Sequence, residues 1–265
     1  MFDHLPKMKD IKVTRLISLM RSVYRLQYAS NLNVNRLLGV QGRQLLKPVA
    51  PNLALLGDIG LHNCKKTREF FEWCNDQYEN VYWVPGVLEM ADHEGKKTWV
   101  ECLDECNESI RGLRNVRICL KYNTTIKEPH FQLLLSPIWQ FTEDPIYTYT
   151  RHGPKQMTQE DFAVLRNSDM NWLLHTGARH SLPVAWMTYA QPFNGLFNYP
   201  KLLCSISGTS DYIKNTSPFR GQKMWTSINM GGYCGYLSDA VWEYSVEKEK
   251  ELSLHDEITK TLVKP

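Results

Sequence analysis

The sequence lacks long apolar runs and regularly spaced cysteines. No window approaches the roughly 18 uninterrupted apolar residues that a membrane-spanning helix needs, and the N-terminal segment has no apolar region typical of a secretory signal. The seven cysteines are an odd set without the paired spacing of a zinc site. We therefore expect a protein that does not span a membrane and whose thiols stay free in a reducing compartment.

Motifs for nucleotide binding and for serine hydrolases are also missing. The chain contains no P-loop, no Gly-x-Gly-x-x-Gly and no Gly-x-Ser-x-Gly. The formal net charge is +3, and residues 1–26 hold six basic against two acidic side chains. A near-neutral body argues against a nucleic-acid partner, which would require an extended basic surface. The basic segment is either a solvated helix face or a peripheral contact to acidic lipid, acidic protein or an import receptor.

The sequence is rich in large aromatic residues and in alternating strand and helix patterns. Its eight Trp and 13 Tyr can anchor a core or an interface. An apolar run at 53–56 ends in Gly57 and Asp58, which predicts a buried strand followed by a tight turn. Apolar residues at helical spacing in 67–78 and a second apolar run at 81–84 complete a strand–helix–strand unit. Its two strands are expected to be parallel.

Further elements follow along the rest of the chain. An amphipathic helix is predicted at 11–24 and a strand at 24–29. Later strands are expected at 116–120, 131–135, 184–188, 202–205 and 225–229, and helices at 158–165 and 168–175. The charged segment 241–262 is expected to form an exposed helix or a docking arm. The chain should thus comprise three parts: a basic extension (1–22), a single domain (23–240) and a charged C-terminal tail (241–265).

Six segments in this order resemble the framework of calcineurin-like metallophosphoesterases. In that family, five short motifs lie on loops at the strand ends and hold two metal ions. The matching segments are LKPVAPNLALLGDIG (46–60), REFFEWCNDQYENVYWVPGVLEM (68–90), LLLSPIWQF (133–141), SDMNWLL (168–174), LPVAWMTYAQP (182–192) and WTSINMGGY (225–233). The resemblance runs from about residue 23 to 236. It implies an α/β fold, namely a metallophosphoesterase-like four-layer αββα sandwich with two mixed sheets.

The first two motifs have lost most of the chemistry that the resemblance implies. A two-metal site needs a bridging carboxylate and several oxygen or nitrogen ligands around each ion. The family's first motif, Asp-x-His, is matched by Asn31 and Asn33, which supply neither the charge nor the imidazole. The second motif keeps Asp58, the bridging carboxylate in the family.

The remaining motifs have lost their metal ligands as well. The third, Gly-Asn-His-Asp/Glu in the family, is matched here by Gly86, Val87, Leu88 and Glu89, so hydrocarbon replaces the metal-binding Asn and the acid/base His. The fourth motif has Tyr189 in place of a His ligand. The fifth, Gly-His-x-His, has no histidine in its counterpart, which falls among Ser205, Ile206, Ser207 and Gly208. We therefore expect no bound metal, no cofactor and no catalysis.

Several polar groups keep alternative interpretations. Asp58 can accept backbone N–H bonds in the turn after its strand without any metal. Glu89 can pair with a nearby Lys or Arg. Arg151 and His152 stand beside a Gly-Pro turn, where they either bind an anion such as phosphate or simply lie at the surface.

Three functions are compatible with this sequence. The favoured one is a catalytically inactive structural or scaffolding subunit of a larger assembly, whose partners are other protein subunits. The second is a module that binds phosphate or nucleotide without turnover, in a pocket lined by Asn31, Asn33, Asp58 and Tyr189. The third is a residual metal-dependent phosphoesterase. The basic N-terminus favours a mitochondrial location, with a cytoplasmic or virion location as the alternative.

Overall fold

A computed structural model describes residues 23–36, 45–46, 48, 50–119, 123–128, 131–179, 181–182, 184–190, 192, 202–209, 236–247 and 251–255. Only the backbone is described for 23–25, 202–204, 206, 209, 236–247 and 251–255. The predicted helix at 11–24 lies outside these ranges apart from its last two residues, and the predicted strand at 225–229 and the extension 1–22 lie wholly outside them.

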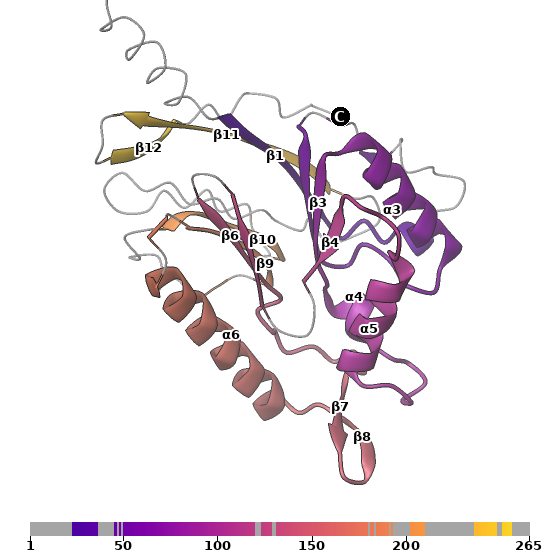
Figure 1. The fold of residues 1–265 in the computed structure, drawn as a ribbon. Coiled ribbons are helices and arrows are strands. Elements are labelled where there is room, and N and C mark those ends of the chain that lie inside the picture. Colours follow the sequence, from indigo (N-terminus) through magenta and orange to yellow (C-terminus); the bar gives the residue numbers. More distant parts are fainter. Residues whose placement is uncertain are drawn as a thin grey trace, which may run out of the picture.

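The first sheet has six strands in the order β12-β11-β1-β2-β3-β4 (Figure 1). Its parallel strands are β1 (Val23–Ser30), β2 (Asn52–Leu56), β3 (Asn80–Val84) and β4 (Val116–Ile118). Strand β11 (Tyr236–Glu247) pairs antiparallel with β1, and β12 (Glu251–His255) pairs antiparallel with β11. The carboxyl ends of β1, β2 and β3 therefore meet at one edge of a mixed sheet.

The second sheet has four strands in the order β10-β9-β6-β5. Strands β6 (Gln132–Ser136), β9 (Val184–Ala190) and β10 (Leu202–Thr209) are parallel, and β5 (Thr124–Lys127) is antiparallel to β6. A separate hairpin, β7 (Tyr147–Thr150) and β8 (Gly153–Gln156), stands out from the lower end of the molecule in Figure 1.

The helices are η1 (Val34–Arg36), α3 (Lys65–Gln77), α4 (Val87–Met90), α5 (Trp99–Ser109) and α6 (Gln159–Arg179). Helix α5 starts at a reciprocal cap, because the Thr98 hydroxyl accepts the Glu101 N–H and the Glu101 carboxylate accepts the Thr98 N–H. Helix α3 lies beside the first sheet and α6 beside the second (Figure 1). None of the helices in the described ranges combines the length and the apolar composition that crossing a bilayer requires.

Both faces of β2 and β3 are buried, and this explains why their sequences are apolar throughout. On one face, residues of the two strands pack against α3; this set is Leu53, Leu55, Val81 and Trp83 with Phe70, Phe71 and Cys74. On the other face they pack against the second sheet; this set is Ala54, Leu56, Tyr82 and Val84 with Leu133, Trp186 and Met187. Each fully buried large apolar side chain contributes about 2 kcal/mol to folding, so this double burial fixes the first sheet between its neighbours.

Most of the predicted elements are confirmed, with shifted ends. The strand–helix–strand unit corresponds to β2, α3 and β3, and its strands are parallel. The strands expected at 131–135, 184–188 and 202–205 are β6, β9 and β10. The fold is α/β with mixed sheets, as expected at that level. The five cysteines whose side chains are described are free, and four of them are buried.

Two expectations differ from the structure. The helices predicted at 158–165 and 168–175 are a single helix, α6, because no proline or glycine separates them. The segment 241–262 was expected to be a helix or an arm, yet its described residues continue β11 and form β12. Val241, Trp242, Tyr244 and Val246 favour strand, and pairing of β11 with β1 satisfies the backbone of both. The expected boundary at 240 thus falls inside β11.

The two sheets approach closely at Gly208, where a Cβ atom would lie 1.7 Å from the carbonyl oxygen of Leu56. Because that oxygen belongs to the buried backbone of β2, it cannot move aside. We predict that Gly208→Ala lowers the free energy of unfolding by about 3 kcal/mol or more in urea titrations. The control is Gly112→Ala, whose Cβ would meet nothing within 4 Å. Only its positive φ of +87° disfavours alanine there, so its free energy of unfolding should fall by about 1 kcal/mol. Equal losses in the two variants would contradict the close approach.

Candidate functional site

The candidate site is built from loops that follow parallel strands. Asn31 and Asn33 follow β1, Asp58 follows β2, and Glu89 lies in α4 just after β3. Asn31, Asn33 and Asp58 have positive φ values of 53°, 46° and 54°. Asn and Asp tolerate this left-handed region better than most residues, which explains why the loops can turn so tightly at these positions.

Backbone hydrogen bonds tie the first two loops together. Asn31 N donates to Gly57 O at 2.9 Å, and Asn33 N donates to Asp58 O at 3.0 Å. The side-chain amide of Asn33 donates to Asn31 O at 3.2 Å, within its own loop. The amide nitrogen of Asn33 thus serves to hold the loop shape.

The Asp58 carboxylate accepts two hydrogen bonds, one on each oxygen. Leu88 N donates to Oδ1 at 2.8 Å, and the Tyr189 hydroxyl donates to Oδ2 at 3.0 Å. The second bond joins the first sheet to β9 of the second sheet across 131 residues of chain. The backbone donor was expected in the turn of Asp58 itself, but it comes from the loop after β3.

Burial controls the protonation of this pair. Burial raises the pKa of Asp58 above its usual value, while the hydrogen bonds from Leu88 and Tyr189 act to lower it. Burial, and then the neighbouring Asp58 charge, raises the pKa of Tyr189 far above its usual value. The phenol therefore keeps its proton and acts as the donor, with the carboxylate as acceptor.

Glu89 is completely buried and accepts four backbone N–H groups. Ile59 and Gly60 donate to Oε1 at 2.6 and 3.1 Å, and Asp58 and Gly86 donate to Oε2 at 2.9 and 2.7 Å. The expectation that Glu89 pairs with a Lys or Arg is therefore wrong. Because these N–H groups come from the loops after β2 and β3, the carboxylate links the two loops.

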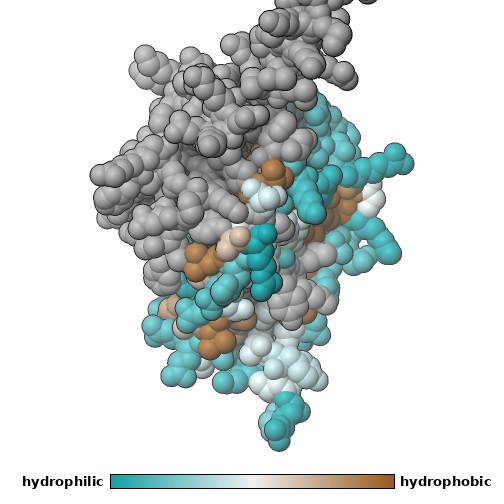
Figure 2. All heavy atoms as spheres, turned by 60° about the vertical axis from the view of Figure 1, so that its left-hand side comes forward, coloured by the Kyte–Doolittle hydropathy of each residue, from teal (hydrophilic) through white to brown (hydrophobic). Residues whose placement is uncertain are grey.

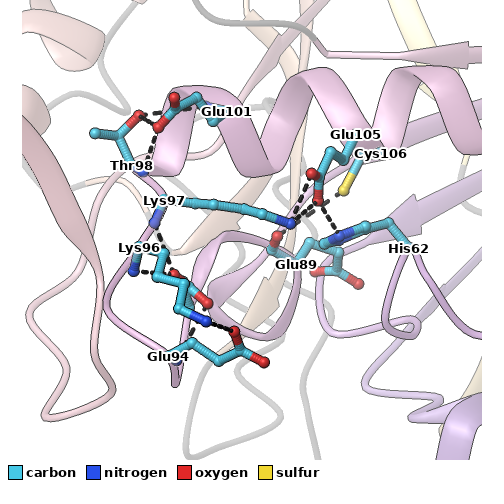
Figure 3. A network of polar contacts seen from close by, with 10 residues as sticks. His62, Glu89, Glu94, Lys96, Lys97, Thr98, Glu101, Glu105 and Cys106 are labelled. Atoms are coloured by element: carbon cyan, nitrogen blue, oxygen red, sulfur yellow. Dashed lines mark hydrogen bonds and ion pairs between the residues drawn. The ribbon is translucent and has the colours of Figure 1, made fainter. Parts of the chain in front are cut away.

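The environment of Glu89 makes its charge costly. Burial, followed by the charge of Asp58, raises the pKa of Glu89 to about 7, although the N–H donors of Gly86, Gly60 and Asp58 oppose this rise. Figure 3 shows Glu89 beside α5, where the Cys106 thiol points at the Glu89 carbonyl oxygen, 3.9 Å away. In the same view Glu105 of α5 contacts both His62 and Lys97, so the loop after β2 is also tied to α5.

A cleft of about 380 Å³ opens above these loops. It is lined by five of the six expected site residues, namely Asn33, Asp58, Val87, Leu88 and Tyr189. Asn31 does not line it, and neither do Ser205, Ser207 and Gly208, which are buried. The structure therefore brings most of the residues that the sequence singled out together in space.

Sequence reasoning missed the other lining residues of the cleft. These are Arg36, Ala91, His93, Gln140, Phe141, Thr142 and Asp144. The run 140–144 follows the carboxyl end of β6, where ligands of α/β proteins commonly bind, so its position was a usable signal. Arg36 and His93 carry no comparable signal, because neither belongs to a recognisable motif.

The residues present are poor metal ligands. Within the described ranges, no three His, Cys, Asp or Glu side chains lie close enough to one another to hold a metal ion. The carboxylate of Asp58 has both oxygens engaged, and Val87 and Leu88 contribute only hydrocarbon side chains to the cleft. This donor set does not fit the pair of divalent cations that the resemblance would require.

Comparison with known proteins assigns no family to the chain. No protein-family model and no curated protein matches its sequence. The resemblance to metallophosphoesterases therefore depends on the order of the six segments and on the loop residues described above.

The four N–H donors around Glu89 allow a sharp test. In Glu89→Gln, one amide NH₂ group must face two backbone N–H groups, so two of the four bonds become repulsive. We predict a loss of about 3 kcal/mol or more in the free energy of unfolding at pH 7.5. Glu69→Gln removes only an exposed contact with Lys65 and should change stability by less than about 0.5 kcal/mol. A small loss in Glu89→Gln would contradict the described hydrogen-bonding pattern.

The Tyr189–Asp58 bond predicts a pH-dependent effect. Tyr189→Phe leaves Oδ2 of the partly buried Asp58 without its protein donor, which should cost about 1 kcal/mol at pH 7.5. Removing that donor raises the folded-state pKa of Asp58 further. A carboxyl group whose pKa is higher in the folded than in the unfolded protein destabilises the fold as the pH rises above its unfolded pKa, which is 3.8 for Asp58. The deficit should therefore be smaller at pH 4.5 than at pH 7.5, while Tyr149→Phe should show no deficit at either pH.

Proposed function

We propose that the chain is a catalytically inactive, metallophosphoesterase-like protein that serves as a structural or scaffolding subunit of a larger protein assembly. In this proposal the two mixed sheets are the inner layers of an αββα sandwich of the metallophosphoesterase type. The burial of β2 and β3 between α3 and the second sheet supports it.

The hydrogen bond from Tyr189 to Asp58 carries the proposal. In an active member of the family, the residue at position 58 would bridge two cations, and the residue at 189 would be one of their nitrogen ligands. Here the phenol oxygen lies 3.0 Å from Oδ2, and its O–H supplies the positive end of a dipole where a cation would otherwise stand. The Leu88 N–H supplies a second donor on Oδ1. A carboxylate satisfied in this way no longer needs a metal.

The chemistry lost with the metals is large. Divalent cations convert a bound water into hydroxide near neutral pH and neutralise the phosphoryl oxygens during attack. Neither Asn31 nor Asn33 can replace a ligand charge, and Leu88 cannot donate a proton to a leaving group. Without these groups the cleft has no means of generating a nucleophile.

A protein-binding role is supported by the exposed apolar side chains. Phe141, Tyr149 and Val164 are exposed to 50%, 75% and 68%. Aromatic side chains are enriched in protein interfaces, so these positions suit other protein subunits as partners rather than nucleic acid. We place the assembly in a mitochondrion, with the cytoplasm or a virion as alternatives, on the basic charge of residues 1–26.

A second candidate function is favoured by Arg36 and His93, which line the cleft and can donate hydrogen bonds to phosphate. In that case the cleft would hold inorganic phosphate or a nucleotide without turnover. Calorimetric titration with phosphate separates the two candidates, because Arg36→Gln should abolish any binding that the cleft provides.

Metal loading and hydrolysis test the proposed function directly. After dialysis against Mn²⁺, the wild-type chain should retain no stoichiometric metal and should not hydrolyse p-nitrophenyl phosphate. The matched variant carries Asn31→Asp, Asn33→His, Val87→Asn, Leu88→His and Tyr189→His, and it should regain Mn²⁺ binding. Stoichiometric metal in the wild type, together with turnover that Asp58→Asn abolishes, would contradict the proposal and show that the chain is an active phosphoesterase. Native mass analysis from source cells should find the chain in a larger complex, and a free monomer would oppose the scaffolding role.

A further inference from the structure

The hairpin β7–β8 projects from the body of the protein. Figure 1 shows it below α5 and α6, and in Figure 2 the lower end of the molecule narrows to a projection whose outermost atoms are hydrophilic. Tyr149 on β7 is 75% exposed, the highest value among the large apolar or aromatic side chains reported as exposed in the described ranges. Leaving so much of an aromatic ring in water forgoes the free energy that its burial would supply.

The base of the hairpin is anchored in the protein core. Ile146 and Met157, which flank the two strands, are 1% and 6% exposed and pack with Trp139 and Phe162. Met157 N donates to Ile146 O at 2.8 Å, and Asp92 N donates to Pro145 O at 2.9 Å. An isolated two-stranded hairpin is only marginally stable in water, so these contacts keep the projecting part in a fixed direction.

The tip of the hairpin is held in one conformation by Thr150. Its hydroxyl donates to Gly153 O at 2.8 Å and accepts the His152 N–H at 3.2 Å. Arg151 and His152, which lie between Thr150 and Gly153, are exposed. A surface that is ordered before binding loses less conformational entropy when a partner docks, so this geometry favours recognition.

All the charged side chains of the hairpin are basic. The segment 145–157 contains Arg151, His152 and Lys155 but no acidic residue. Neither Arg151 nor Lys155 forms an ion pair within 4.0 Å among the residues that the structure describes. Lys155 has a longer-range electrostatic interaction with Asp161, but both cations are exposed and can contact an acidic surface on another molecule.

We propose that the hairpin β7–β8 is a docking arm for an acidic patch on a partner protein, with Tyr149 as the apolar anchor and Arg151 and Lys155 as the charged contacts. Tyr and Arg are the residue types that most often dominate binding energy at protein interfaces. The inference deepens the proposed assembly role by naming the surface and the chemistry of its partner.

The charges around the hairpin favour a folded acidic protein over a nucleic acid. Glu143 and Asp144 precede the hairpin, and Glu160 and Asp161 follow it. An extended polyanion that reached from the tip to the base of the hairpin would meet these carboxylates and be repelled. A compact acidic patch would touch only the tip, which is basic and aromatic.

Binding of two labelled probes of equal length tests the proposal on the full chain. One probe is the five-residue peptide Asp-Glu-Tyr-Glu-Asp, which is short enough to contact the hairpin tip alone, and the other is an oligo-uridylate. By fluorescence anisotropy at low salt, the peptide should bind the wild type more tightly than the oligonucleotide does. Tyr149→Ala and the double variant Arg151→Glu with Lys155→Glu should each weaken peptide binding about tenfold.

The matched control is the double variant Arg114→Glu with Lys127→Glu. It reverses two exposed cations elsewhere and changes the net charge equally, so peptide binding should weaken less than about twofold. Equal losses in the two double variants, or no peptide binding at all, would overturn the docking arm. If the oligonucleotide bound more tightly than the peptide, and the hairpin variants lost this binding, the partner of the hairpin would be a nucleic acid and not an acidic protein. These variants should not change metal content or hydrolysis. Failure of the docking-arm proposal can therefore be told apart from failure of the proposed function.

Discussion

Burying a carboxylate is unfavourable by several kcal/mol unless its oxygens are satisfied, and the loops at this sheet edge are arranged around that requirement. Glu89 collects four N–H groups from the loops after β2 and β3, and it thereby fixes the turn that presents Asp58. Gly86 is required beside it, because a Cβ there would lie 2.7 Å from both the amide nitrogen and Oδ1 of Asp58. The position of Asp58 therefore depends on Glu89.

Asp58 in turn joins the two sheets. Its bond to Tyr189 crosses from the loop after β2 to β9, and Leu88 closes the other oxygen. A metal ion could make the same connection in an active enzyme, with the carboxylate and a histidine as ligands. Under the proposed function, the phenol takes the place of such an ion and keeps the loops together. The proposal would then account for a framework that persists without catalysis.

The sequence predicted the framework better than the loops. The apolar runs of β2 and β3 and the helical spacing of apolar residues in α3 were sufficient to predict the strand–helix–strand unit. Burial of both faces of the two strands requires such apolar runs. The position of Tyr189 opposite Asp58 followed from the order of the resembling segments. The partners of Glu89 could not be predicted, since they are backbone N–H groups whose direction depends on positive φ at Asp58. The strands β11 and β12 were missed because pairing of β11 with the distant β1, and of β12 with β11, outweighs their charged local sequence.

We infer that a hydrogen bond from the Tyr189 hydroxyl, rather than a cation, satisfies Oδ2 of Asp58. Anomalous diffraction from crystals of the wild-type chain soaked in Mn²⁺ tests it most directly. The account predicts no anomalous peak near Asp58 and a Tyr189 oxygen within hydrogen-bonding distance of Oδ2. Two anomalous peaks bridged by the Asp58 carboxylate, with Tyr189 turned away, would contradict it.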